Sequence, residues 1–149
     1  MAERSHHLFD AAEHALPQIR QWLRVQLGPL ATSRDGYQFI MAVDELCANI
    51  IEHADQRPAI MRGGGSISIE FRQYAARAEA RITYAGEPFD PTGFEPEAIS
   101  EIIRKGQNGG LGLRLISRMQ MQMGYFREDG LNVCILAKRL RGARAAGQG

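Results

Sequence analysis

The sequence lacks several features that would place it in a special class of protein. Its apolar runs are far shorter than the roughly 20 residues that cross a bilayer, and its start, MAERSHHLFD, has no apolar core of a signal peptide. The formal net charge is only +1 in 149 residues, so no overall field favours nucleic acid or a membrane surface. We therefore expect a cytoplasmic protein with one domain over residues 1–140 and a disordered tail over 141–149.

Cysteine is scarce as well. The chain has two, Cys47 and Cys134, which match no paired metal-binding spacing and lie in apolar runs. This pattern excludes a disulfide framework and predicts two buried, reduced thiols.

Hydrophobic periodicity predicts two helices in the first third of the chain. Residues 11–27 repeat apolar side chains at helical spacing, and Pro17 is tolerated where the regular helix would begin. Gly28 and Pro29 end this helix, and residues 30–34 form a linker. A second helix should run from Asp35 to Ala54. Its apolar face comprises Phe39, Ile40, Val43, Leu46, Cys47, Ile50 and Ile51.

Alternating patterns predict four strands in the remainder of the chain. They cover residues 66–74, 76–84, 121–127 and 131–139, and form two hairpins. Short helical pieces are predicted near residues 96–105 and 113–119. This order predicts an α+β fold, a two-layer sandwich in which helices cover one face of a mixed, mostly antiparallel sheet.

One edge of the second helix carries polar residues at a regular spacing. Glu45, Asn49 and His53 follow one another at intervals of four, which places them along one side of a helix, about 5–6 Å apart. Glutamate can act as a general base, and an asparagine carbonyl is a suitable ligand for Mg²⁺. A solvated helix edge is the alternative interpretation.

Two further stretches suggest a binding site. Residues 108–116, NGGLGLRLI, place glycines before a helix, where free backbone N–H groups can bind phosphate. A flexible helix start would have the same pattern. Residues 85–91, AGEPFDP, follow a strand and would by themselves indicate a simple loop.

Taken in order, these motifs resemble those of the anti-sigma-factor serine/threonine kinases. The resemblance covers roughly residues 10–140 and rests on ELCAN followed by HA, on GEPFDP, on GGLGLRLI and on a last strand with Lys138. These kinases belong to the GHKL superfamily of ATPases, which has the Bergerat (histidine-kinase-like ATPase) fold.

The resemblance implies ATP and Mg²⁺ as cofactors and assigns roles to the site residues. Asn49 would ligate Mg²⁺, and Glu45 would act as base toward a serine or threonine hydroxyl of a partner protein. Gly86 would let the backbone approach adenine. Residues 91–110 would form a lid in which Arg104 and Lys105 neutralise phosphate charge. The phosphates would contact backbone N–H groups of Gly110, Leu111, Gly112 and Leu113.

The adenine-reading positions depart from the family pattern. Tyr84 stands where the family has an aspartate that accepts from the adenine amino group. Leu131 and Asn132 lie where the family has a threonine. ATP could then bind weakly through its phosphates, a different nucleotide or anion could bind, or the protein could be a degenerate, non-catalytic interaction module.

The resemblance also implies partners. It favours partner switching with an anti-sigma-factor antagonist of the STAS type, with a sigma factor as a second candidate and a homodimer compatible with the family. No nucleic acid or membrane partner is expected. A detached sensor-kinase module that phosphorylates histidine is a rival, but His6, His7 and His14 lie in too short an N-terminal stretch for a phosphoacceptor helix.

Overall fold

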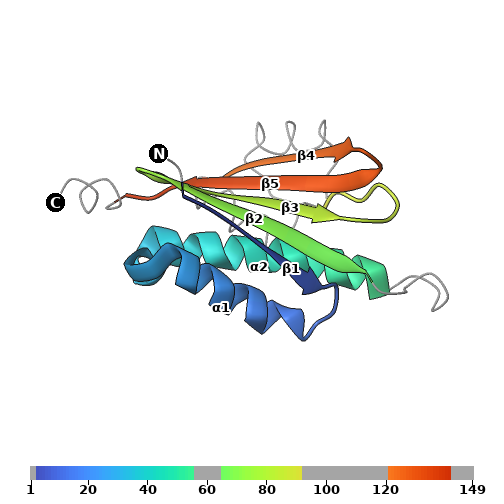
Figure 1. Ribbon diagram of the computed structural model, residues 1–149, viewed down its shortest axis with the longest axis horizontal. Helices are drawn as coiled ribbons and strands as arrows, with labels where there is room; N and C mark the ends of the chain where they lie inside the picture. The colour runs from blue at the N-terminus through green and yellow to red at the C-terminus, as the bar shows by residue number, and fades with distance from the viewer. Residues whose placement is uncertain (1–2, 56–64, 92–120, 142–149) are drawn as a thin grey trace, which may run out of the picture.

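The computed structural model describes residues 3–55, 65–91 and 121–141, and these form two layers (Figure 1). The element order is β1 (Glu3–Asp10), α1 (Ala15–Leu27), η1 (Gly28–Thr32), α2 (Arg34–Asp55), β2 (Ser66–Tyr74), β3 (Arg77–Tyr84), β4 (Gln122–Glu128) and β5 (Leu131–Arg139). The α+β sandwich predicted from the sequence is confirmed.

The described strands form one sheet in the order β1-β2-β3-β5-β4, and every neighbouring pair is antiparallel. The predicted order began with a helix and omitted β1. This strand is hard to recognise locally because, as an edge strand, it buries little besides Phe9. The strand is defined by its pairing with β2, in which Phe9 lies opposite Ile67.

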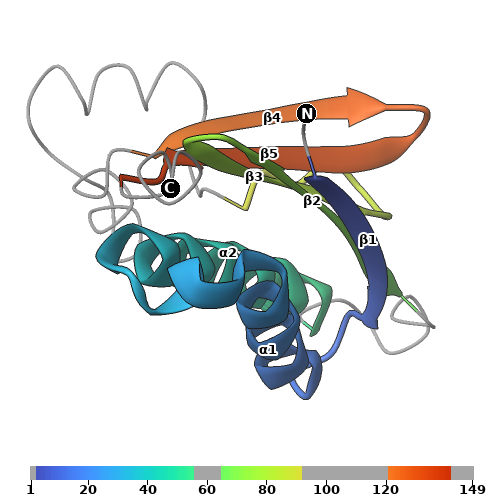
Figure 2. The same cartoon turned by 60° about the vertical axis from the view of Figure 1, so that its left-hand side comes forward.

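Both described helices lie on one face of the sheet (Figures 1 and 2). Helix α1 begins at Ala15 rather than at Pro17, which falls in the first turn, where a backbone N–H has no helical partner. The predicted linker is partly the 3₁₀ helix η1. Neither described helix combines the length and hydropathy that a membrane-spanning helix needs.

The core lies between the sheet and the two helices. All seven residues predicted for the apolar face of α2 are buried, and they pack with inward residues of the strands such as Ile69, Phe71 and Ile82. Cys47 and Cys134 are buried free thiols, as predicted. The predicted helical pieces near residues 96–105 and 113–119, and residues 142–149 of the tail, lie outside the described residues.

A buried charge cluster joins the end of β5 to the start of α2. The Asp35 carboxylate lies 3.5 Å from Lys138 Nζ, and both residues are about 4% exposed or less. Asp35 also accepts hydrogen bonds from the backbone N–H and the guanidinium of Arg141. Burial alone would raise the pKa of Asp35, but these hydrogen bonds and the Lys138 charge lower it below its ordinary value. The cluster orients α2, which carries the candidate site.

Candidate functional site

The polar edge of α2 lies beside the segment that follows β3. Glu45 and Asn49 are half-buried on this helix. Asn49 Nδ2 donates a hydrogen bond of 2.9 Å to the Pro91 carbonyl. Within the described residues, neither Asn49 Oδ1 nor the Glu45 carboxylate has a hydrogen-bond partner. The edge therefore presents a free amide oxygen and a free carboxylate one helical turn apart.

His53, the third residue of this edge, stacks on Phe89. The two ring centroids are 3.9 Å apart and the ring planes differ by 7°. The Nε2 atom of His53 is buried and has no hydrogen-bond partner among the residues that the structure describes. The stack attaches the end of α2 to the loop after β3.

The backbone of Phe89 is fixed from the sheet side. The Tyr84 hydroxyl donates a hydrogen bond to the Phe89 carbonyl. The Phe89 N–H points to both Tyr125 Oη and Asn132 Oδ1, each at 3.0 Å. Phe89 is thus held through its ring, its N–H and its carbonyl.

Tyr84 and Asn132 stand opposite each other in the sheet. They are cross-strand partners in β3 and β5, and both side chains are buried. Leu131, the alternative position weighed for the family's threonine, is 38% exposed. Burial raises the pKa of the Tyr84 hydroxyl well above its ordinary value, so the side chain is neutral.

The amide of Asn132 makes three hydrogen bonds within the protein. Its oxygen accepts from the Phe89 N–H and, at 2.5 Å, from the Tyr125 hydroxyl. Its nitrogen donates to the Glu87 carbonyl at 3.1 Å. A bound base would have to displace part of this network to hydrogen-bond with Asn132.

Gly86 lies where the loop leaves β3. Its φ of 109° is a conformation that side-chain-bearing residues rarely adopt, so glycine suits this position. The Gly86 carbonyl accepts a hydrogen bond of 2.9 Å from Arg127 Nη1 of β4. The backbone conformation explains the glycine at this position, and its predicted role in the approach of adenine stays a prediction.

Sequence reasoning missed Tyr125 and Arg127, which hold this loop from β4. Both alternate with Met123 along the strand, and in the register with β5 this set shares the helix-facing side with Asn132 and Cys134. The alternation was visible in the sequence. The hydrogen-bond partners of Tyr125 and Arg127 could not be inferred, because they depend on the register of β4 with β5.

The residues predicted to contact the phosphates are not among those that the structure describes. Lys105, Gly110, Leu111, Gly112 and Leu113 lie outside the described residues. In the described part of the chain, no three His, Cys, Asp or Glu side chains gather into a metal site. The structure thus describes the α2 edge and the loop after β3, residues 85–91, which we call the base-side loop. Asn49 and His53 join the two.

Comparison with known proteins agrees with this arrangement. Residues 9–138 match the family described as Histidine kinase-like ATPase domain. The chain is 32% identical over 105 residues to serine-protein kinase RsbW of Halalkalibacterium halodurans, covering 68% of this chain and 60% of that protein. It is 28% identical over 140 residues to serine-protein kinase RsbW of Bacillus subtilis, covering 87% and 84% of the two chains.

A third relative is serine/threonine-protein kinase BtrW of Bordetella bronchiseptica. It is 28% identical over 114 residues, which cover 74% of this chain and 76% of that protein. The match spans less than two thirds of the Halalkalibacterium relative but most of the other two. The resemblance drawn from the motifs is confirmed, and the chain belongs to the histidine kinase-like ATPase domain family.

Proposed function

We propose that this protein is an ATP- and Mg²⁺-dependent serine/threonine protein kinase that regulates transcription by partner switching. It would phosphorylate an anti-sigma-factor antagonist of the STAS type in the cytoplasm, with a sigma factor as a second partner. The observation that carries the proposal is the α2 edge. There, Asn49 is anchored to Pro91 through its nitrogen, and its oxygen, beside the half-buried Glu45, has no hydrogen-bond partner in the described part of the chain.

The donor atoms on this edge suit the expected cofactor. Mg²⁺ prefers hard oxygen ligands and retains several waters, so one amide oxygen from the protein is a suitable contribution. ATP with Mg²⁺ supplies the phosphoryl group and neutralises its charge when bound. Lys105 and the backbone of Gly110, Leu111, Gly112 and Leu113 are the proposed phosphate contacts, and Gly86 is the proposed contact beside the base.

The chain's own residues then have two tasks. The Glu45 carboxylate accepts the proton of the partner's hydroxyl as that oxygen attacks phosphorus. Asn49 would contribute its amide oxygen to the ion, because its nitrogen is already bound to the Pro91 carbonyl at 2.9 Å. The two residues lie about 5–6 Å apart, which suits a nucleophile and a metal-bound phosphate placed side by side.

A second candidate function is contact without catalysis, and the base-side loop favours it. Tyr84 is neutral and buried where the family has an aspartate. Its hydroxyl donates a hydrogen bond to the Phe89 carbonyl. The Asn132 oxygen already accepts two hydrogen bonds from the protein, and its nitrogen donates one. Loss of one charged hydrogen bond to adenine weakens binding by about tenfold to a hundredfold.

Calorimetric titration of ATP with Mg²⁺ tests the proposal. We expect the wild type to bind and Asn49→Ala to lose binding. Asn49→Asp is the matched control, because it keeps an oxygen ligand but removes the donor to Pro91. Equal loss in both variants would attribute the effect to the Pro91 contact. No binding by the wild type, together with binding gained by Tyr84→Asp, would favour the contact-only function.

A further inference from the structure

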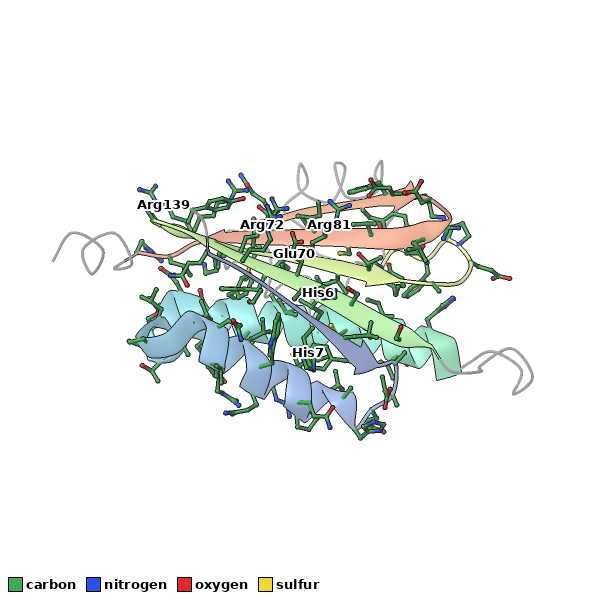
Figure 3. The ribbon with its side chains drawn as sticks, viewed as in Figure 1. His6, His7, Glu70, Arg72, Arg81 and Arg139 are labelled. Carbon is green, nitrogen blue, oxygen red and sulfur yellow. The ribbon has the colours of Figure 1, made fainter. Side chains whose placement is uncertain are left out.

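Two arginines face each other at the end of the sheet opposite the candidate site. Arg77 of β3 pairs directly with Arg139 of β5, so their side chains share the face that the helices leave uncovered. Figure 3 labels Arg139 at this end of the sheet. Like charges placed directly opposite on antiparallel strands destabilise the pairing. A bound anion would relieve this repulsion.

No described carboxylate supplies that charge. Arg77 donates to the neutral Gln122 Oε1 at 3.1 Å, and neither arginine forms an ion pair within the described residues. Neighbouring arginines of the same face differ in this respect. Arg72 lies 2.7 Å from the Glu70 carboxylate, and Arg81 is paired with Glu128 (Figure 3).

The two arginines line a hollow of about 420 Å³, together with Tyr74 and Gln122. Glu79 is the one carboxylate of β3 and lies two residues from Arg77 on the same face of the strand. It stands opposite Arg72 and forms no ion pair with Arg77 or Arg139 within the described residues. The hollow therefore combines two guanidinium groups, an aromatic ring and an amide. These groups can hold a carboxylate through paired, charge-assisted hydrogen bonds.

The surrounding charge favours an acidic ligand. Lys138 and Arg141 lie at the same end of β5 and both contact Asp35, but Lys138 is buried on the helix-facing side and contributes no charge to the hollow. On the uncovered face itself, the two arginines have one carboxylate of β3 near them, that of Glu79, so positive charge is in excess there. The chain as a whole has a net charge of only +1, so the positive charge is concentrated locally.

From this geometry we propose that the Arg77/Arg139 hollow is a docking site for an acidic segment of a partner protein. The two guanidinium groups would hold a glutamate or aspartate carboxylate of that segment. The hollow lies seven residues along β3 from Tyr84, about 23 Å at 3.3 Å per residue. It is thus well separated from Tyr84 and the loop after β3, and its occupation does not depend on the proposed kinase activity.

The test is an NMR titration of the ¹⁵N-labelled full chain with a hexaglutamate peptide. We expect amide shifts at Ala75, Ala76 and Gln122, which line the hollow or its turn. Arg77→Gln and Arg139→Gln should each weaken binding by about tenfold. Glu79→Gln should strengthen it, because it removes the nearest negative charge.

Arg24→Gln is the matched control. Arg24 is an exposed arginine of α1 that also donates to a glutamine, Gln21 Oε1 at 3.5 Å, so this variant makes the same charge change away from the hollow. Binding should be unchanged in it. Equal weakening in Arg24→Gln, no shifts at the hollow, or binding of inorganic phosphate without the peptide would each overturn the proposal.

Discussion

The rings of His53 and Phe89 stack with their centroids 3.9 Å apart, and this contact joins the end of α2 to the loop after β3. The same phenylalanine is bound to Tyr84, Tyr125 and Asn132 through its backbone. One residue of the loop therefore connects the proposed metal-binding helix with the strands that would read the base. The first prediction concerns this connection.

Phe89→Ala should lower the free energy of unfolding by about 1–3 kcal/mol, because it removes a half-buried ring and its stack. Phe89→Leu should recover part of this loss, since it restores apolar bulk without an aromatic face. Urea unfolding of the three proteins measures both effects. An unchanged midpoint in Phe89→Ala would show that the stack contributes nothing to stability.

The second prediction concerns the ionisation of Tyr84. Its pKa is raised by burial, so its phenol should stay neutral at pH 10, near the ordinary pKa of tyrosine. The absorbance difference at 295 nm between wild type and Tyr84→Phe should remain flat through pH 10 and appear on unfolding. The unfolded chain releases this proton at lower pH, so stability should fall as the pH rises above about 10. A phenolate signal from the folded protein at pH 10 would contradict the buried position.

Asp35→Asn should cost about 3–5 kcal/mol, because it removes the buried carboxylate that pairs with Lys138 and accepts hydrogen bonds from Arg141. The matched control is Asp10→Asn, an exposed aspartate 3.2 Å from His14 Nε2, for which we expect less than about 0.5 kcal/mol. Thermal or urea unfolding at neutral pH compares the two variants.

The same site predicts a pH dependence. The pKa of Asp35 is lowered in the folded state, so its contribution is present above the ordinary value of 3.8 and is lost as the pH falls through the lowered pKa. The stability difference between wild type and Asp35→Asn should therefore shrink on acidification. A difference that stays constant from neutral pH to about pH 2 would be inconsistent with an ionised Asp35.

Glu45→Gln should bind ATP with Mg²⁺ as the wild type does, but transfer phosphate to a partner's serine about 10²–10⁴ times more slowly, as expected for loss of a general base. Glu52→Gln, an exposed glutamate of the same helix, is the control and should have normal activity. A radiolabelled transfer assay with a candidate antagonist protein measures both. Unchanged transfer in Glu45→Gln would remove Glu45 from the proposed mechanism.

The two thiols should be inert in the native protein. Burial raises the pKa of Cys134 to about 12, and it raises the pKa of Cys47 still further. Iodoacetamide at pH 8 should therefore modify neither thiol before unfolding and both afterwards. Modification at the rate of an exposed cysteine would show that the core opens readily.

Local pattern was enough to predict most of the described elements. The strands at Ser66–Tyr74 and Leu131–Arg139 have the predicted bounds, and the buried face of α2 is the predicted one. These features depend on side-chain periodicity, which neighbouring residues in the chain determine. The motif on α2 likewise needed only a helix to bring Glu45, Asn49 and His53 to one side.

Tertiary structure decided the remainder. β1 depends on its pairing with β2, and the loop network depends on a register that places Asn132 opposite Tyr84. The Asp35 cluster joins residues 106 positions apart, and Arg77 meets Arg139 only because β3 and β5 are neighbours. Hydrogen bonds and charges between distant segments leave no local period, because their geometry exists only after the sheet has assembled.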